Sequence, residues 1–265
     1  MSGPTIVVCM KQVPDPEVPA SSFEIDPEAK RVVPIGVPPV INPFDENALE
    51  AALRIKDEVG GRVLAVSLVE RPAMAVLRKA LSVGAEELFL LQGEGLEELD
   101  GYCTAVVLAA ALKRIGTYDL ILTGRQSSDW GSAQVGPMLA ELLGIPSIGF
   151  AQEVRVQDRM VLVKRLRRIG YEVVRAPLPA LITASSEIGD LRLPSLQAIR
   201  EAAKKPVTVW RMEDLDLRPE DLRPRELHGL APPPPRQRRC LFIDGDTPEE
   251  RGERLALRLR QDGLL

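Results

Sequence analysis

Cysteine, histidine and aromatic residues are scarce in this chain of 265 residues, and long apolar runs are missing. Its three cysteines, Cys9, Cys103 and Cys240, are widely spaced and form neither a zinc-binding pattern nor a disulfide framework, so a reducing cytoplasm is expected. The N-terminus lacks the charged and then apolar pattern of a targeting signal. No apolar run reaches the roughly 18 residues of a membrane span, and we expect a chain that does not itself span a membrane.

Positive charge is also lacking, because the net charge is -4. This argues against a nucleic-acid binder, which needs a basic face, and the one dense basic run, at residues 236–239, is typical of a solvated linker. His228 is the only histidine, and Asp244-Gly245-Asp246 lacks the spaced acceptors of a calcium loop. We therefore predict no metal site.

What the chain does have is a regular alternation of strands and helices. Apolar runs typical of buried strands alternate with patterns typical of helices, which predicts a parallel sheet with right-handed crossovers. The expected strands are residues 5–10, 62–68, 87–91, 120–123, 147–150 and 180–183, and the expected helices are residues 46–59, 73–83, 102–115 and 135–143. Residues 153–156, 160–166 and 171–175 predict antiparallel strands that close one edge of that sheet.

The most informative stretch is the loop between the strand at 120–123 and the next helix. It begins at Gly124, is polar throughout, and enters the helix past Gly131 and Ser132, where an anion can approach free backbone N–H groups. By pattern alone, an ordinary polar loop is an equally good interpretation.

Beyond residue 190 the pattern is no longer that of a domain. We predict a nucleotide-binding α/β domain at residues 1–190 and a C-terminal segment and arm at residues 191–265, with residues 232–235 as a stiff proline spacer. The last helix has a clear start, with Thr247 as N-cap and Pro248 at its first position, before Leu255 and Leu257. Such a helix packs either on the body of the chain or on another chain.

Several short motifs, in order along nearly the whole chain, resemble those of the electron transfer flavoprotein β subunit. The motifs are residues 7–11, 41–50, 81–85, 124–129, 133–137, 178–184 and 193–196. The resemblance implies a Rossmann-like, adenine-nucleotide-binding-like α/β fold. It also implies a heterodimer with an α subunit that holds most of the FAD and is embraced by the C-terminal arm. Electrons would pass between acyl-CoA or other flavin dehydrogenases and a quinone-reductase-type acceptor.

The family's β subunit has a nucleotide site of its own, occupied by AMP in ordinary members and by a second FAD in electron-bifurcating ones. No side chain there acts as acid, base or nucleophile, since the flavin supplies the chemistry. The resemblance assigns this site to Cys9, Asn42, Pro43, Phe44, Asp45, Leu68, Gly124, Arg125, Gln126, Ser127, Ser128, Asp129, Trp130, Gly131, Ser132, Ala133, Gln134 and Val135.

This chain departs from the family pattern at three places. One is near Pro16, where the tyrosine that in some members touches the partner's flavin is replaced. Asp129-Trp130-Gly131 replaces the acidic loop of ordinary members, whereas residues 133–137 are closer to bifurcating ones, so AMP and FAD both stay open. Ile188 stands where the family has its anchoring leucine, so the resemblance makes it the residue that docks a dehydrogenase.

Two functions of other classes remain as alternatives. One is an ATP-dependent enzyme of the same broad fold, although the serine-glycine-glycine loop of such enzymes is replaced here by Lys11-Gln12-Val13-Pro14. The other is a nucleotide-sensing protein, which has little use for a long C-terminal arm.

Overall fold

A computed structural model describes residues 3–222, 224–232, 234 and 240–265. The chain divides into two units, Met1–His228 and Gly229–Leu265. The first unit extends past the expected boundary at residue 190, because the strand β13 (Val207–Trp210) pairs with β7 (Glu87–Gln92) and joins the main sheet. Two sequence features, the basic run Arg236-Gln237-Arg238-Arg239 and the prolines Pro233 and Pro235, lie outside the described residues.

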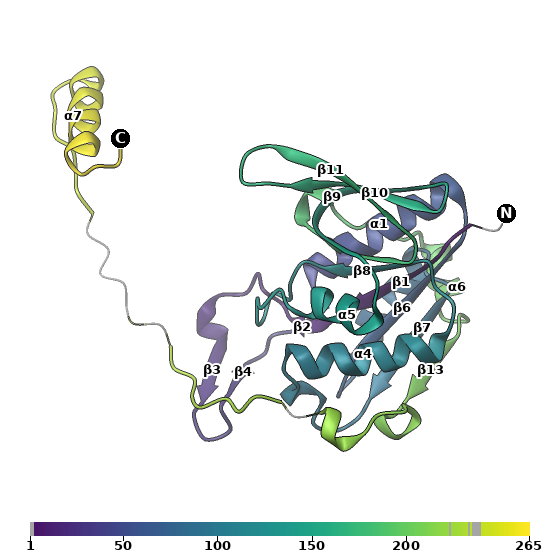
Figure 1. Cartoon of the computed structure of the whole chain (residues 1–265). Helices are drawn as coiled ribbons and strands as arrows, with labels where there is room; N and C mark the ends of the chain where they lie inside the picture. Colours follow the sequence, from purple (N-terminus) through teal and green to yellow (C-terminus); the bar gives the residue numbers. More distant parts are fainter. Residues whose placement is uncertain (1–2, 223, 233, 235–239) are drawn as a thin grey trace. The chain divides into compact units, whose positions relative to one another are not determined.

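The first unit is built on a nine-stranded sheet with the order β11-β10-β9-β12-β8-β1-β6-β7-β13 (Figure 1). All neighbours from β9 to β13 in this order are parallel, and β10 and β11 are antiparallel additions next to β9. The remaining bounds are β1 (Thr5–Met10), β6 (Arg62–Val69), β8 (Leu120–Gly124), β9 (Ser147–Gln157), β10 (Met160–Leu166), β11 (Tyr171–Pro177) and β12 (Ala180–Ala184). The predicted parallel sheet with an antiparallel edge is confirmed.

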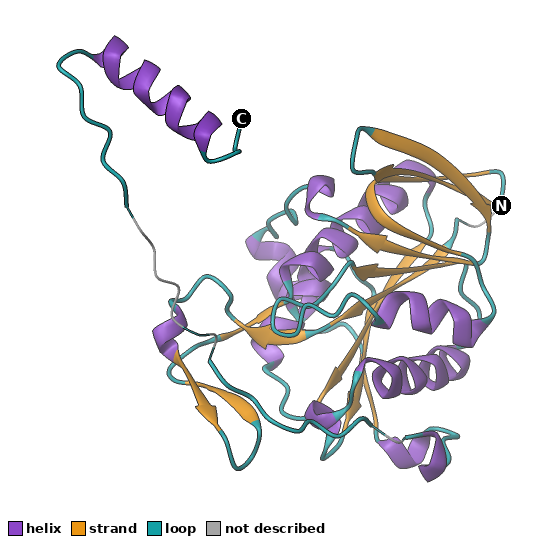
Figure 2. Cartoon of the chain, turned by 60° about the vertical axis from the view of Figure 1, so that its left-hand side comes forward, coloured by secondary structure: helices purple, strands orange, loops and turns teal. Residues whose placement is uncertain are grey.

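Helices cover both faces of this sheet, as Figure 2 shows. One face packs against α1 (Pro43–Val59), α2 (Met74–Leu77), α3 (Lys79–Val83) and α6 (Leu196–Ala202). The other face packs against α4 (Gly101–Ile115) and α5 (Val135–Leu143). The result is a three-layer α/β/α arrangement of the Rossmann-like kind.

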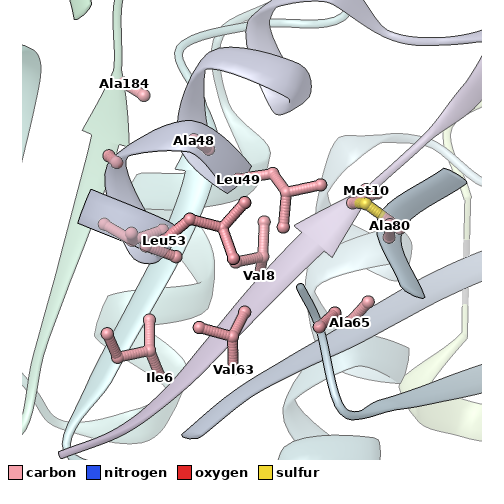
Figure 3. Packing of buried hydrophobic residues seen from close by; sticks show 14 of the residues in the cluster. Ile6, Val8, Met10, Ala48, Leu49, Leu53, Val63, Ala65, Ala80 and Ala184 are labelled. Atoms are coloured by element: carbon pink, nitrogen blue, oxygen red, sulfur yellow. The ribbon is translucent and has the colours of Figure 1, made fainter. Parts of the chain in front are cut away.

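The core on the α1 side explains why the sequence folds in this way. Figure 3 shows Leu49 and Leu53 of α1 pointing onto Ile6 and Val8 of β1, and all four side chains are fully or almost fully buried. A buried leucine or isoleucine contributes about 1.5–3 kcal/mol relative to an exposed one, so this contact holds α1 against the sheet.

The proline-rich stretch after β1 forms two small ribbons. The strands β2 (Gln12–Pro14) and β5 (Pro39–Ile41) pair with each other, and β3 (Phe23–Asp26) and β4 (Arg31–Pro34) form an antiparallel hairpin. Short 3-10 turns complete the first unit: η1 (Ala20–Ser22), η2 (Leu96–Glu98), η3 (Ser186–Ile188), η4 (Met212–Asp214) and η5 (Pro219–Asp221).

Two expected elements differ from the observed ones. The strands expected at 147–150 and 153–156 are a single strand, β9, whose pairing shifts where Phe150 adopts a φ of 61°. The helix expected at 73–83 is two short helices that meet at Arg78. The helix α6 begins after Ser195, which serves as its N-cap and accepts a hydrogen bond from the Ala198 N–H.

The second unit contains the predicted helix α7 (Pro248–Gln261). The Thr247 Oγ1 accepts the Glu250 N–H at 3.2 Å, as expected of an N-cap. Leu255 and Leu257 of this helix are 45% and 54% exposed. Among the described residues of the whole chain, no helix is both long enough and apolar enough to cross a bilayer.

Candidate functional site

The order of the strands creates a switch point between β1 and β8. From β1 the chain moves to β6 and β7 on one side, and then returns to place β8 on the other side of β1. In open α/β sheets, ligands bind at the carboxyl ends of the strands at such a point, because the connections diverge there and leave a crevice. The residues from Gly124 onward follow β8 at this edge.

Asp45, in the first turn of α1, joins the two strands at the switch point. Its Oδ2 accepts the Lys11 N–H at 2.7 Å and its Oδ1 accepts the Gly124 N–H at 2.9 Å. The carboxyl is only 6% exposed, and burial raises its pKa to about 7 despite these hydrogen bonds, which favour the charged form. A Cβ at Gly124 would lie 2.5 Å from the Asp45 Oδ1, so only glycine fits there.

Asn42 and Lys11 hold the following loop in place. Asn42 is buried, and its Nδ2 donates to the Gln126 carbonyl at 2.8 Å while its Oδ1 accepts the Ser128 N–H at 3.0 Å. The Lys11 Nζ lies 2.5 Å from the Asp129 Oδ2. The residues just after β1 and just before α1 therefore fix both halves of this loop, although they lie more than 80 positions away in sequence.

Arg125 and Ser128 bring unsatisfied polar atoms to this edge. The Arg125 guanidinium lies over the Phe44 ring, 4.6 Å from its centroid, and the Arg125 N–H donates to the Ala184 carbonyl at the end of β12. Among the described residues, the Arg125 Nε and the Ser128 Oγ are buried without a hydrogen-bond partner. Buried polar atoms normally have partners, so these two mark a place where a polar ligand group would improve the structure.

The loop then turns towards α5. The Gly131 N–H donates to the Ser127 carbonyl at 2.9 Å, and Gly131 and Ala133 both have positive φ values, 63° and 55°. Within the described chain we find no acceptor for the backbone N–H groups of the exposed segment 132–134. Together with the positive end of α5, these groups form a surface that suits an anion. Trp130, at the tip of the loop, is 61% exposed.

Other residues assigned to the site take supporting positions. Cys9 is buried in β1 and paired on both sides, with Val66 and Thr123. Burial, and next the nearby charge of Asp45, raises the pKa of the Cys9 thiol to about 12, so the thiol stays protonated and unreactive. Leu68 lies half-buried near the end of β6, Pro43 begins α1, and Val135 begins α5.

Ile188, expected to dock a dehydrogenase, has a different environment. Its side chain is 5% exposed and belongs to the core, where it cannot anchor a partner without moving. Its carbonyl accepts the Arg54 Nη1 at 2.8 Å, within a network centred on Glu50 that sequence reasoning missed. The buried Glu50 carboxylate accepts hydrogen bonds from the Arg192 Nε at 3.0 Å and the Arg54 Nε at 2.9 Å, which holds this segment on α1. Hydrophobic patterning gives no sign of such a network.

A cavity of about 210 Å³ lies away from the switch point, between α1, β9 and η3. Its lining includes Arg54, Glu58 and Arg155. We regard the switch point as the better candidate site, since the loop, the helix terminus and the unsatisfied polar atoms meet there.

A family profile described as "Electron transfer flavoprotein domain" matches residues 32–215, which include most of this edge of the sheet. The chain belongs to the electron transfer flavoprotein β-subunit family. Similar proteins include the caffeyl-CoA reductase-Etf complex subunit CarD of Acetobacterium woodii, 39% identical over 81% of both chains. The electron transfer flavoprotein subunit beta of Thermoanaerobacterium thermosaccharolyticum is 38% identical over 82% of both chains. Protein FixA of Azorhizobium caulinodans is 34% identical over 84% of this chain and 80% of its own length.

Membership in this electron transfer flavoprotein family associates the chain with flavin-dependent electron transfer. The switch-point residues fit a nucleotide. They offer unpaired N–H groups at 132–134 for a phosphate and the unsatisfied Arg125 and Ser128 atoms for further polar groups.

Proposed function

We propose that this chain is the β subunit of a heterodimeric electron transfer flavoprotein and carries its own adenine nucleotide at the β1/β8 switch point. The observation that carries the proposal is the loop 124–131, which Asn42, Asp45 and Lys11 hold in place from the far side of the switch point. A loop fixed in this way is preorganised, so binding a nucleotide would not require the entropy loss of ordering the loop.

Each part of the site has a proposed role. The N–H groups at 132–134 and the Ser132 hydroxyl would hold a phosphate at the start of α5. The guanidinium of Arg125, stacked on Phe44, would face the remaining polar groups of the ligand. A bound flavin would supply the electron transfer itself, and these residues would fix its position and exclude water.

The partners and the choice of nucleotide belong to the same proposal. The relative CarD is named as a subunit of a caffeyl-CoA reductase-Etf complex, which supports a role in a complex with a flavin dehydrogenase and with an α subunit that holds FAD. AMP would make the chain part of a conventional electron carrier, whereas a second FAD would make it part of an electron-bifurcating one. We assign it to the cytoplasm. The ATP-dependent enzyme and the nucleotide sensor are less well supported, because the chain belongs to the flavoprotein family.

The test is to co-express the chain with its α-type subunit, denature the purified complex, and quantify the released nucleotides. One FAD and one AMP per heterodimer would support the conventional carrier, and two FAD would support bifurcation. A complex without flavin, or two chains that do not associate, would refute the proposal.

A pair of variants tests the position of the nucleotide. Ser132→Glu places a carboxylate beside the proposed phosphate and should lower the nucleotide affinity by about tenfold or more, since like charges at contact repel by about 1–4 kcal/mol. Ser21→Glu, at an exposed serine in η1 distant in sequence from the loop, is the control and should leave the affinity unchanged. Equal nucleotide affinity in both variants would place the nucleotide elsewhere.

A further inference from the structure

Trp130 is the aromatic side chain of the loop that follows β8, and its ring lies largely in solvent. The chain has two tryptophans, and the other one, Trp210, packs on Phe89 with ring centroids 5.0 Å apart and lies under the Arg114 guanidinium. Trp130 is 61% exposed and, within the described part of the chain, joins neither core cluster and makes no aromatic or cation–π contact. Tryptophan is highly buried on average, so an indole exposed beside a ligand site indicates a contact that the chain does not complete by itself.

The backbone that carries Trp130 is held by its neighbours. The Trp130 N–H donates to the Asp129 Oδ1 at 2.9 Å, and the Asp129 Oδ2 lies 2.5 Å from the Lys11 Nζ. On the other side of the tryptophan, the Gly131 N–H donates to the Ser127 carbonyl at 2.9 Å. The indole therefore extends from an ordered turn, and tryptophan has only two side-chain torsions, so little conformational entropy is lost when a ligand covers the ring.

Trp130 lies close to the backbone that we assign to the phosphate. The N–H groups of residues 132–134 follow it by two to four positions, so its Cα lies at most about 14 Å from them even in a fully extended chain. In a nucleotide, one sugar separates the phosphate from the base. A ligand whose phosphate lies at 132–134 can therefore place a flat ring on the Trp130 indole.

The other groups of the loop favour a nucleotide over an apolar protein surface as the occupant. The Arg125 Nε and the Ser128 Oγ are buried and, among the described residues, lack hydrogen-bond partners. An apolar protein surface would cover the indole of Trp130 but would leave these polar atoms and the N–H groups at 132–134 unsatisfied. A nucleotide brings a flat ring, hydroxyl groups and a phosphate in one molecule, so it can satisfy all three.

From these observations we infer that the Trp130 indole stacks on the flat heteroaromatic ring of the bound nucleotide and so contributes to the choice of ligand. The inference rests on the proposed nucleotide site and adds to it the residue that recognises the ring. The ring is the adenine of AMP or FAD, or the isoalloxazine of FAD. Each of these presents a π-face that can stack on an indole.

The test uses the complex co-expressed with the α-type subunit, dialysed to remove bound nucleotide and titrated separately with AMP and with FAD by calorimetry. The site that Ser132→Glu weakens is the one followed. Trp130→Ala should raise the Kd of this site about tenfold or more, as expected for the loss of one stacked ring. Trp130→Phe keeps a flat ring and should stay within about threefold of the wild type, whereas Trp130→Leu keeps only an apolar side chain and should behave like the alanine variant. The control is Val209→Ala, at a valine that is 50% exposed in β13 on the far edge of the sheet, and it should stay within about twofold.

Tryptophan fluorescence gives a second measurement that a purely structural role of Trp130 would not change. The difference in emission between the wild-type complex and Trp130→Phe isolates this indole from every other tryptophan of the complex. Adenine does not absorb at the wavelengths of tryptophan emission, so AMP quenches the indole only by contact. Equal losses of AMP and FAD affinity in Trp130→Ala, together with quenching by AMP, assign the stacked ring to adenine, and a loss for FAD alone assigns it to isoalloxazine. Both results support the inference.

Other outcomes would overturn it. Unchanged affinity for both nucleotides in Trp130→Ala, while Ser132→Glu still weakens binding, would overturn the stacking and leave the nucleotide site standing. A wild-type complex that binds neither nucleotide would overturn both. Equal affinities of Trp130→Phe and Trp130→Leu would show that the ring does not stack, and this comparison still decides if the alanine variant fails to fold by circular dichroism. A Trp130→Ala complex that loses the α-type subunit but keeps its nucleotide affinity would make the partner subunit the occupant.

Discussion

Replacing Asp45 by asparagine tests whether the buried carboxyl that joins β1 and β8 is protonated in the folded chain. Burial raises the pKa of Asp45 from its ordinary value of 3.8 to about 7. Between these two pH values the folded chain holds a proton that the unfolded chain has lost. The free energy of unfolding should therefore fall as the pH rises from about 4 to about 7.

The size of this effect follows from the shift. One pKa unit corresponds to about 1.4 kcal/mol, so the contribution of Asp45 to stability should decrease by about 3 kcal/mol between pH 4.5 and pH 7. The asparagine side chain of the Asp45→Asn variant does not titrate. Its amide oxygen replaces only one acceptor, and its NH₂ group faces a backbone N–H of Lys11 or Gly124, which costs about 1–3 kcal/mol at every pH.

The assay is urea unfolding of the wild type and of Asp45→Asn at half-unit steps from pH 4.5 to pH 7.5, followed by far-ultraviolet circular dichroism. All other titrating groups are common to both proteins, so their effects cancel in the difference. The advantage of the wild type should shrink by about 3 kcal/mol as the pH rises. A difference that stays constant across this range would mean that Asp45 is charged throughout, and the reasoning from burial would be wrong.

Three more predictions concern the packing of the first unit. Ser67→Ala should raise the free energy of unfolding by about 1 kcal/mol in thermal melts, because the Ser67 Oγ is fully buried and, in the described chain, lacks a hydrogen-bond partner. A lower free energy of unfolding in the variant would mean that the Ser67 hydroxyl has a hydrogen-bond partner. Gly124→Ala should lower the free energy of unfolding by about 3 kcal/mol or more, since the new Cβ would lie 2.5 Å from the buried Asp45 Oδ1. Gly131→Ala, which has open space around it but a φ of 63°, should lower the free energy of unfolding by about 1 kcal/mol. Equal decreases in the two variants would refute the close contact at Gly124. Arg192→Ala should lower the free energy of unfolding by about 3 kcal/mol, because the buried Glu50 loses its bidentate partner. In a double-mutant cycle with Glu50→Gln, measured by urea unfolding, the coupling energy between the two side chains should be about 1 kcal/mol or more. Additive effects would mean that the two side chains act independently.

Elements with strong local patterns could be predicted from the sequence. The strands β1 and β10 have the predicted bounds, and Thr247 caps α7 as predicted. Alternating apolar residues and side-chain caps act over a few positions, so a short stretch of sequence contains all the information they need. The ordered motifs at 41–50 and 124–137 identified the family in the same way.

Elements whose form depends on distant contacts could not be predicted. β9 continues through Phe150 because its neighbours β10 and β12 keep pairing on either side of the irregularity, and no local pattern shows this. Ile188 matches a docking residue by its position in a motif, but the network around Glu50 and Arg192 holds that segment on α1, where the isoleucine is buried. Exposure depends on the surroundings, which a motif does not contain.

The sequence by itself determined the fold class, most of the elements, the family and the loop that we assign to the nucleotide. Only the tertiary structure decided that β1 lies between β6 and β8, that Asp45 joins two strand ends rather than facing solvent, and that Ile188 is buried. The physical reason is how far apart in the sequence the interacting residues lie. Local patterns fix hydrogen bonds between residues a few positions apart, whereas strand order, burial and the pKa values that follow from burial arise from contacts between residues far apart in the chain.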